Sequence, residues 1–253
     1  MMNTPMIQIK NLSLKIDEKP ILNSISFDIF TSDYISSIGP NGAGKTSLLK
    51  CLMKIYPFPS GSIFLNSNPL ETYSQKELAK YISYVPQSDG RFFPFSVEEF
   101  VMMGRYPHLS PFTSYTRNDR QAVFDALELT HASHLAHRQI NTLSGGERQT
   151  VFIAAALAQG AEILLLDEPT TFLDPRHDDE ICRILQHINR KIGKTIITVT
   201  HNINHAALYS DRVVILKHGE ILYNGKAGEI MTNKILEKAC LLYTSPSPRD
   251  LST

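Results

Sequence analysis

Apolar and polar residues alternate over the first 30 positions of the chain. Residues 7–16 read IQIKNLSLKI and residues 21–30 read ILNSISFDIF, with a polar break at 17–20. Apolar side chains two positions apart lie on one face of an extended strand. The pattern therefore predicts an antiparallel hairpin near the start of the chain.

The pattern then changes to short, continuous apolar runs that alternate with helical segments. Between two of these runs, the apolar residues of segment 178–192 fall on one face of a helix, which completes a βαβ unit. RVVILK at 212–217 and GEILYNG at 219–225 predict a further hairpin. Four runs predict strands of a parallel sheet, buried on both faces: YISSIG at 34–39, YISYV at 81–85, EILLLD at 162–167 and KTIITVT at 194–200.

Residues 87–160 carry helical rather than strand patterns. Segments 96–106, 116–130 and 146–159 have helical spacing and are enriched in alanine or leucine. We therefore expect an α/β core, formed by residues 6–86 and 161–239, with a helical subdomain at 87–160 inserted into it. Because we find no internal repeat, residues 6–239 are expected to form a single domain.

The composition narrows the classes of function. The chain has 253 residues, 42% of them hydrophobic, and its 25 basic residues balance 25 acidic ones. Without a net charge, nothing in the global balance favours nucleic acid or an anionic membrane as a partner. We find neither a membrane-spanning apolar run nor a secretory signal and expect a cytosolic location. Cys51, Cys182 and Cys240 lack metal-ligand spacing and are expected to be small buried apolar residues.

Residues 240–253 differ in character from the segment before them. CLLYTSPSPRDLST abandons the helical pattern of NKILEKA at 233–239 and alternates serine with proline. It resembles a translated sequencing adapter and is expected to be non-native, with a native disordered tail as the alternative. We base no functional inference on it.

A glycine-rich loop at 39–47 has the sequence of a phosphate site. It reads GPNGAGKTS and lies between a predicted strand and a helical segment, so it fits G-x-x-x-x-G-K-[ST]. Lys45 would reach the β- and γ-phosphates and the Thr46 hydroxyl would bind Mg²⁺. A turn with a solvated lysine is the alternative, which the flanking elements disfavour. The expected ATP-binding residues of the loop are Gly39, Pro40, Asn41, Gly42, Ala43, Gly44, Lys45, Thr46 and Ser47.

Polar residues follow three other predicted strands where ligands bind in open α/β sheets. Asp167 and Glu168 end one strand, and His201 and Gln87 follow two others. Asp167 is expected to hold Mg²⁺ and Glu168 to act as general base on the attacking water. His201 could contact the γ-phosphate, and Gln87 could contact Mg²⁺ and the water. Each residue taken singly could instead be a structural group at a strand end.

A second candidate anion site lies far from the first in the sequence. In LSGGERQ, at 143–149, a serine and two glycines open a helical segment. Free backbone N–H groups and the helix dipole converge at such a position. One nucleotide-sized domain thus carries two candidate phosphate sites, far apart in the sequence.

Five motifs together resemble those of ATP-binding-cassette (ABC) ATPases: GPNGAGKT, YVPQ, LSGGERQ, ILLLDEP and VTHN, in this order. The resemblance covers about residues 6–239. It implies an α/β, P-loop NTPase fold with a RecA-like parallel-sheet core, an N-terminal antiparallel β subdomain and an inserted helical subdomain. It also implies ATP and Mg²⁺ as ligands, and a head-to-tail homodimer in which LSGGERQ at 143–149, the family's signature, closes from one subunit on the other's ATP.

The resemblance assigns roles to further residues by their position. Asp174 would link the two sites, and His201 would be the switch histidine. Ile16 stands where an aromatic side chain usually stacks on adenine, and would offer apolar contact without a π-face. The residues that would contact the partner's nucleotide are Ser144, Gly145, Gly146, Glu147 and Asp174.

A finer resemblance lies in FPFSVEEFVMMGRYPHLSPF, at 93–112, which is similar to importer ATPases for ferric siderophores, haem and cobalamin. It implies integral membrane permease subunits as partners at the cytoplasmic face of the membrane, and indirectly a periplasmic or lipid-anchored substrate-binding protein. Phe92, Phe93, Phe95 and Tyr106 would be interface anchors, or else would pack inside the helical subdomain.

Two other classes of function compete with the importer. A non-transport cassette ATPase acting on nucleic acid or ribosomes usually has a coiled-coil insertion or a second cassette, and neither pattern occurs here. A guanine-nucleotide switch or a small-molecule kinase would share only the phosphate loop, and LSGGERQ argues against both. We therefore expect ATP hydrolysis coupled to import, with no nucleic-acid partner.

Overall fold

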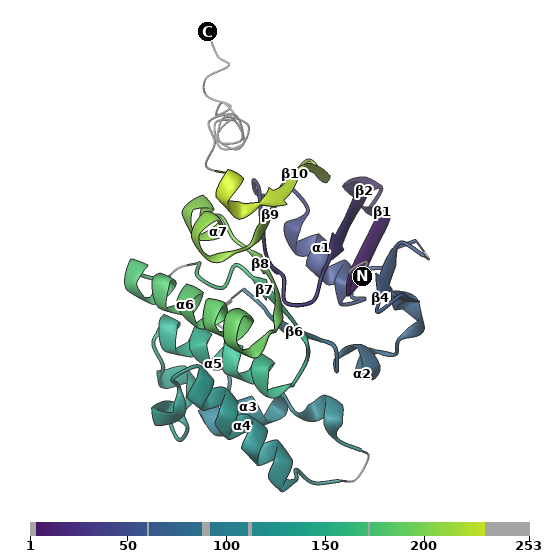
Figure 1. Cartoon of the computed structure of the whole chain (residues 1–253). Helices are drawn as coiled ribbons and strands as arrows, with labels where there is room; N and C mark the ends of the chain where they lie inside the picture. The colour runs from purple at the N-terminus through teal and green to yellow at the C-terminus, as the bar shows by residue number, and fades with distance from the viewer. Residues whose placement is uncertain (1–3, 60, 88–91, 111–112, 172, 231–253) are drawn as a thin grey trace.

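The structure is a computed structural model of the whole chain (Figure 1). The expected helix at 233–239 and the segment 240–253 lie outside the part that it describes. The described residues are 4–59, 61–87, 92–110, 113–171 and 173–230.

An antiparallel sheet forms from the start of the chain, in the order β2 (Lys19–Ile29), β1 (Ile7–Ile16), β4 (Ile63–Leu65) and β5 (Asn68–Pro69). The predicted hairpin is confirmed, since β1 and β2 pair antiparallel along their length. The apolar alternation of β1 slips by one residue after Ile9, and a register irregularity at this point keeps Leu12 buried.

A second sheet has six strands in the order β10-β9-β3-β8-β7-β6. The four predicted apolar runs all form strands in it, and β9 joins them in parallel, whereas β10 closes an antiparallel hairpin. The His218–Gly219 turn of this hairpin has positive φ at both residues, as the right-handed twist of the flanking strands favours. Its strands are β3 (Tyr34–Ile38), β6 (Ile82–Val85), β7 (Ile163–Asp167), β8 (Thr195–Val199), β9 (Arg212–Lys217) and β10 (Glu220–Lys226).

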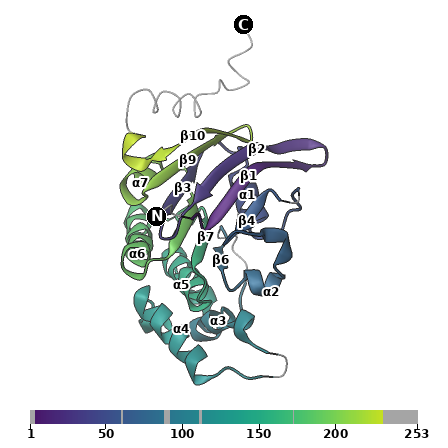
Figure 2. The ribbon, with the colours of Figure 1, turned by 45° about the vertical axis from the view of Figure 1, so that its right-hand side comes forward.

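The second sheet is covered on both faces, which explains its continuous apolar runs. Alternate residues of β7 point to opposite cores: Leu165 packs with α1 and the antiparallel sheet, whereas Leu164 packs with α6. Figure 2 shows α6 and α7 on the side of the sheet away from β1 and β2. The helices are α1 (Lys45–Leu52), α2 (Gln75–Leu78), α3 (Val97–Met103), α4 (Arg117–Leu129), α5 (Gly145–Ala158), α6 (Pro175–Ile192) and α7 (Ile203–Tyr209).

Helices α3, α4 and α5 pack together at one end of the molecule (Figures 1 and 2). Their facing side chains form a separate apolar cluster that includes Val101, Val123 and Val151. Each of the three helices begins with a capping box, in which a serine or threonine and an acidic residue three positions later satisfy each other's backbone N–H groups. The predicted helical segments 96–106, 116–130 and 146–159 thus form helices within one or two residues of their expected starts.

Candidate nucleotide site

The glycine-rich loop joins β3 to α1 and places Lys45 at the first position of the helix. The Lys45 side chain is buried, and its Nζ donates to the carbonyl oxygens of Gly39 at 2.7 Å and Pro40 at 2.9 Å. Gly39 has φ 149°, and a Cβ there would lie 2.0 Å from the carbonyl oxygen of Leu216. Only glycine therefore fits where the loop leaves the sheet.

Thr46 and Asp167 meet next to this loop. The Thr46 hydroxyl donates to Asp167 Oδ1 at 2.9 Å, and the Tyr84 hydroxyl donates to Asp167 Oδ2 at 3.2 Å. Strands β6 and β7 are neighbours, and their carboxyl ends bring Tyr84 and Asp167 to the same sheet edge. The structure thus brings together the threonine and the aspartate that were predicted as magnesium ligands. Tyr84 was not predicted, although it belongs to the YVPQ motif.

Glu168 receives hydrogen bonds from two further predicted residues. His201 Nε2 lies 2.5 Å from Glu168 Oε1, and the Gln87 side-chain amide donates to Oε2 at 3.1 Å. Thr171, which was not predicted, also donates to Oε2 at 3.0 Å. Glu168 has φ 51°, a left-handed backbone conformation that turns its side chain out of the line of β7. Residues from three strand ends therefore converge on one carboxylate.

A cavity of about 210 Å³ lies over the loop and extends to Glu168. Ile16 was predicted to contact adenine. In the structure it packs partly against the core, and Ile21 rather than Ile16 borders this cavity, so contact between Ile16 and adenine stays a prediction. The cavity is lined by Ile21, Asn41, Gly42, Ala43, Gly44, Lys45, Thr46, Ser47 and Glu168. It is therefore formed by the phosphate-loop residues together with the candidate general base.

Burial shifts the acid–base properties of this site. Desolvation lowers the pKa of the Lys45 ammonium, while the carboxylates of Glu168 and Asp167 act in the opposite direction. Desolvation also raises the pKa of Asp167, while hydrogen bonds from Thr46 and Tyr84 counteract it. Both net shifts disfavour the charged forms, and an anionic phosphate beside Lys45 would stabilise its charged form.

The donor set around Asp167 suits a magnesium ion. Mg²⁺ prefers hard oxygen ligands and commonly takes one or two from protein side chains and the rest from phosphates and water. The Thr46 hydroxyl and the Asp167 carboxylate are oxygen donors 2.9 Å apart, beside a cavity that borders the phosphate loop. These two residues could hold the ion. Gln87, the third predicted ligand, donates a hydrogen bond to the neighbouring Glu168.

The signature segment forms the start of α5 rather than part of this cavity. Ser144 is the N-cap, its hydroxyl accepts from the Glu147 backbone N–H at 3.3 Å, and its own N–H donates to Glu147 Oε2 at 2.7 Å. Ser144 and Gly145 are exposed, whereas Gly146 is buried. Among the described residues, the cavity lining includes none from α5. The exposed N-terminus of α5 is therefore separate from the cavity, and its role as a second anion site stays a prediction.

Asp174 lies on the loop that packs against this helix start. It caps α6 by accepting from the backbone N–H groups of Arg176 and His177, and it also accepts from His177 Nδ1 at 2.6 Å. A Cβ at Gly146 would lie 2.5 Å from the His177 ring, so the signature glycine permits this close approach. The signature and the Asp174 loop thus form one surface.

The phosphate loop, the carboxylates at the strand ends and the mixed sheet define a P-loop NTPase. The ABC transporter family description matches residues 22–171, which is more than half of the chain. The chain belongs to this family of nucleotide-binding transport ATPases, and the predicted fold class is confirmed.

Curated relatives align over nearly the full chain. The iron(3+)-hydroxamate import ATP-binding protein FhuC of Bacillus subtilis is 39% identical, over 90% of this chain and 85% of its own length. The ferric enterobactin transport ATP-binding protein FepC of Escherichia coli is 34% identical, over 94% and 89%. The hemin import ATP-binding protein HmuV of Shewanella denitrificans is 35% identical, over 92% of both.

Solved structures agree with this assignment. A putative metal-chelate type ABC transporter in an inward-facing conformation superposes with a TM-score of 0.82 and 28% identity, over 94% of this chain and 90% of that one. A dimeric ATP-binding cassette with bound ADP and phosphate superposes with a TM-score of 0.75 and 27% identity, over 88% and 99%. The ABC cassette fold is therefore shared in full.

The aromatic segment after Gln87 divides into exposed and buried side chains. Phe92 is 76% exposed and Tyr106 is 71% exposed. Phe93 instead packs edge-on against Phe100 and Phe152, with ring centroids 5.2 and 5.8 Å apart, so it is a core residue rather than a surface anchor. Within the described residues, no helix has the length and apolar character needed to cross a membrane.

Proposed function

We propose that this chain is the ATP-hydrolysing subunit of an importer for iron–siderophore, haem or cobalamin-type chelates. The observation that carries the proposal is its similarity, along most of its length, to three relatives named for iron-hydroxamate, enterobactin and hemin import. All three relatives are named for import or transport, which disfavours the alternative of a non-transport cassette acting on nucleic acid or ribosomes.

In the proposed reaction, Glu168 accepts a proton from the water that attacks the γ-phosphate. His201 and Gln87 position its carboxylate, since each contacts a different oxygen of Glu168. Lys45 supplies positive charge to the phosphates once its contacts with the loop carbonyls are exchanged for phosphate oxygens. Thr46 and Asp167 would hold Mg²⁺, with Gln87 as a further ligand, and the ion would neutralise developing phosphate charge.

Two chains are proposed to complete each ATP site. As far as the structure describes the chain, the phosphate-loop cavity borders no signature residue, and the N-terminus of α5 is exposed. A head-to-tail dimer would place Ser144, Gly145, Gly146 and Glu147 of one subunit against the triphosphate of the other, with Asp174 beside them. ATP binding would then close the dimer and hydrolysis would reopen it, which moves the membrane subunits between two states.

The dimer can be tested with paired N-cap substitutions in a chain that carries Glu168→Gln. ATP should double the mass of this chain in solution, as measured by light scattering. Adding Ser144→Asp keeps a good N-cap but places a negative charge against the partner's phosphates, so the doubling should be lost. Ser96→Asp makes the same change in the capping box of α3 and should leave the dimer intact. A chain that stays monomeric with ATP in the Glu168→Gln background would contradict the proposal.

The permease is proposed to bind the surface around α3. Exposed Phe92 and Tyr106 lie at either end of this helix, and a cavity of about 380 Å³ there is lined by Phe95, Met102 and Tyr115 among others. Aromatic side chains at such a surface are typical interface anchors. Docking here would place the chain peripherally on the cytoplasmic face of the membrane, with a periplasmic or lipid-anchored binding protein acting through the permease.

Co-purification tests this surface and then the substrate. Phe92→Ala with Tyr106→Ala should release a co-expressed permease, whereas Leu208→Ala, an exposed apolar residue on α7, should not. The complex can then be reconstituted in liposomes with candidate binding proteins. Stimulation of ATP hydrolysis by ferric hydroxamate, ferric catecholate, haem or cobalamin identifies the chelate, and stimulation by none of them would refute the proposed substrate class.

A further inference from the structure

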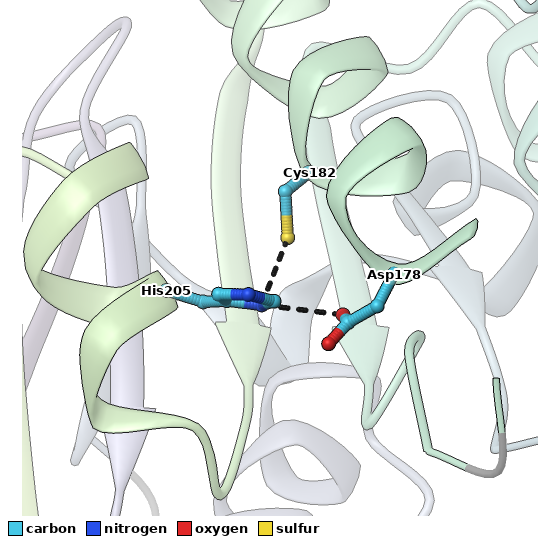
Figure 3. Close-up of side chains that lie close together, drawn as sticks. All are labelled: Asp178, Cys182 and His205. Atoms are coloured by element: carbon cyan, nitrogen blue, oxygen red, sulfur yellow. Dashed lines mark hydrogen bonds and ion pairs between the residues drawn. The ribbon is translucent and has the colours of Figure 1, made fainter. Parts of the chain in front are cut away.

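Three side chains with metal-binding atoms meet between α6 and α7 (Figure 3). Asp178 and Cys182 lie one turn apart on α6, and His205 faces them from α7. One ligand atom of each lies within 4.8 Å of the others. The fold brings these residues together, since 23 positions separate Cys182 from His205.

The spacing of these atoms is close to that of a coordination sphere. His205 Nδ1 lies 3.4 Å from Cys182 Sγ and 3.2 Å from Asp178 Oδ1. Metal–ligand bonds of roughly 2.0–2.3 Å at tetrahedral angles separate neighbouring ligand atoms by roughly 3.3–3.6 Å. A small rotation of the Asp178 carboxylate towards the sulfur would complete three corners of a tetrahedron.

A buried carboxylate oxygen without a hydrogen bond distinguishes this cluster from an ordinary contact between two helices. Asp178 Oδ1 is closed off from solvent and accepts no hydrogen bond within the described part of the chain, and its 3.2 Å contact with His205 Nδ1 is an ion pair only when the imidazole is protonated. Buried carboxylate oxygens are normally satisfied, and a metal ion is one way to satisfy them. A cavity of about 10 Å³ borders Cys182 and His205, enough for roughly one water molecule as a fourth ligand.

We propose that Asp178 Oδ1, Cys182 Sγ and His205 Nδ1 bind a thiophilic divalent cation of the Zn²⁺ type. Burial, reinforced by the carboxylates of Asp178 and Asp179, raises the pKa of the Cys182 thiol to about 12, so the free protein keeps this proton. To bind, the ion must displace the thiol proton to solvent. It must also bind the imidazole through Nδ1, which requires the neutral tautomer with its proton on Nε2. Zn²⁺ and Co²⁺ do this readily, whereas Mg²⁺ and Ca²⁺ do not.

An ion at this position would join two segments of the candidate ATP site. Asp174 is the N-cap of α6, and α7 begins two residues after His201. The cavity beside the cluster is also lined by Pro169 and Thr170, which follow Glu168 in the chain. Bound metal would therefore hold α6 and α7 together, next to the loop after Glu168 and separate from the Mg²⁺ site at Asp167.

Cobalt spectroscopy tests the site in the tag-free full chain, with Cys240→Ser in every protein. One equivalent of Co²⁺ should give a thiolate-to-cobalt charge-transfer band, and Zn²⁺ should displace it. Cys182→Ser and His205→Gln should each weaken Zn²⁺ binding by at least about 100-fold. Cys51→Ser removes the other buried thiol, which lies in a different core cluster, and should change affinity by less than about threefold.

Folding of each variant is checked by circular dichroism and by ATP binding, and Zn²⁺ should raise the melting temperature of the parent but not of His205→Gln. Absence of a thiolate band would overturn the proposal. A band that persists in Cys182→Ser would overturn it too. If Cys182→Ser does not fold, loss of Zn²⁺ binding in folded His205→Gln supports the site, and unchanged binding refutes it.

Discussion

The carboxylate of Glu168 is the group whose removal should separate ATP binding from hydrolysis. In the substitution Glu168→Gln, the side chain keeps its shape, and its amide oxygen can still accept from Gln87 and Thr171 while the amide NH₂ faces His201 Nε2, which accepts in the neutral tautomer. It can no longer take a proton from the attacking water. The variant should therefore be folded like the parent and specifically defective in the chemical step.

The expected loss of turnover follows from the size of general-base catalysis. Such a base contributes roughly 10²–10⁴-fold, or about 3–5 kcal/mol of barrier. Binding should not suffer, because the cavity is lined mainly by the phosphate loop and Lys45 keeps its place in it. Removing a negative charge at the cavity edge should slightly strengthen ATP binding, since it removes repulsion of the γ-phosphate.

Phosphate release and fluorescent-nucleotide titration measure the two effects separately. Glu162→Gln is the matched control, because Glu162 is exposed and lies just before β7, at the opposite end of the strand from Glu168. This control should hydrolyse ATP like the parent. Turnover of Glu168→Gln within about threefold of the parent, with ATP binding intact, would refute the role given to this carboxylate.

Three further predictions concern stability. Gly39→Ala would place a Cβ 2.0 Å from the carbonyl oxygen of Leu216. It should lower the free energy of unfolding in urea by about 2–4 kcal/mol and should also abolish nucleotide binding. Leu165→Ala, fully buried in β7, should cost about 2–5 kcal/mol, whereas Leu222→Ala on the exposed hairpin should cost less than about 1 kcal/mol. Hydrogen bonds from Thr116, together with the Arg105 guanidinium, lower the pKa of buried Asp119 from 3.8 to about 2. The charged carboxylate therefore stabilises the fold by about 2 kcal/mol above pH 3.8, and this contribution should vanish as the pH falls towards 2. Asp119→Asn should lack this contribution and its pH dependence. Unfolding free energies measured between about pH 6 and 2 test this.

Local patterns were sufficient for the elements and for the phosphate loop. The continuous apolar runs identified β3, β6, β7 and β8, because a strand covered on both faces has no polar side to show. The loop at 39–47 could be assigned as well, since its backbone geometry depends on glycines that are adjacent in the sequence. The motif order then pointed to the family, which the comparisons confirmed.

Packing decided which side chains meet. The sequence does not distinguish exposed Phe92 from partly buried Phe93, because the positions of Phe100 on α3 and Phe152 on α5 determine which ring is covered. The sequence also does not show that Ile21 rather than Ile16 lies beside the cavity. Both residues are on the same hairpin, and only the packing of the hairpin against the phosphate loop places Ile21 there.

The sequence by itself determined the α/β class, the phosphate loop and the family, all of which depend on neighbouring residues or on ordered motifs. The spacing of residues along the sequence did not mark Cys182 as a metal ligand. His205 comes close to Cys182 only when α6 and α7 pack on the same face of the sheet. Contacts between distant segments depend on where whole helices lie, and a single sequence does not encode this in any local period. The tertiary structure alone therefore decided the hydrogen bonds around Glu168 and the cluster of Asp178, Cys182 and His205.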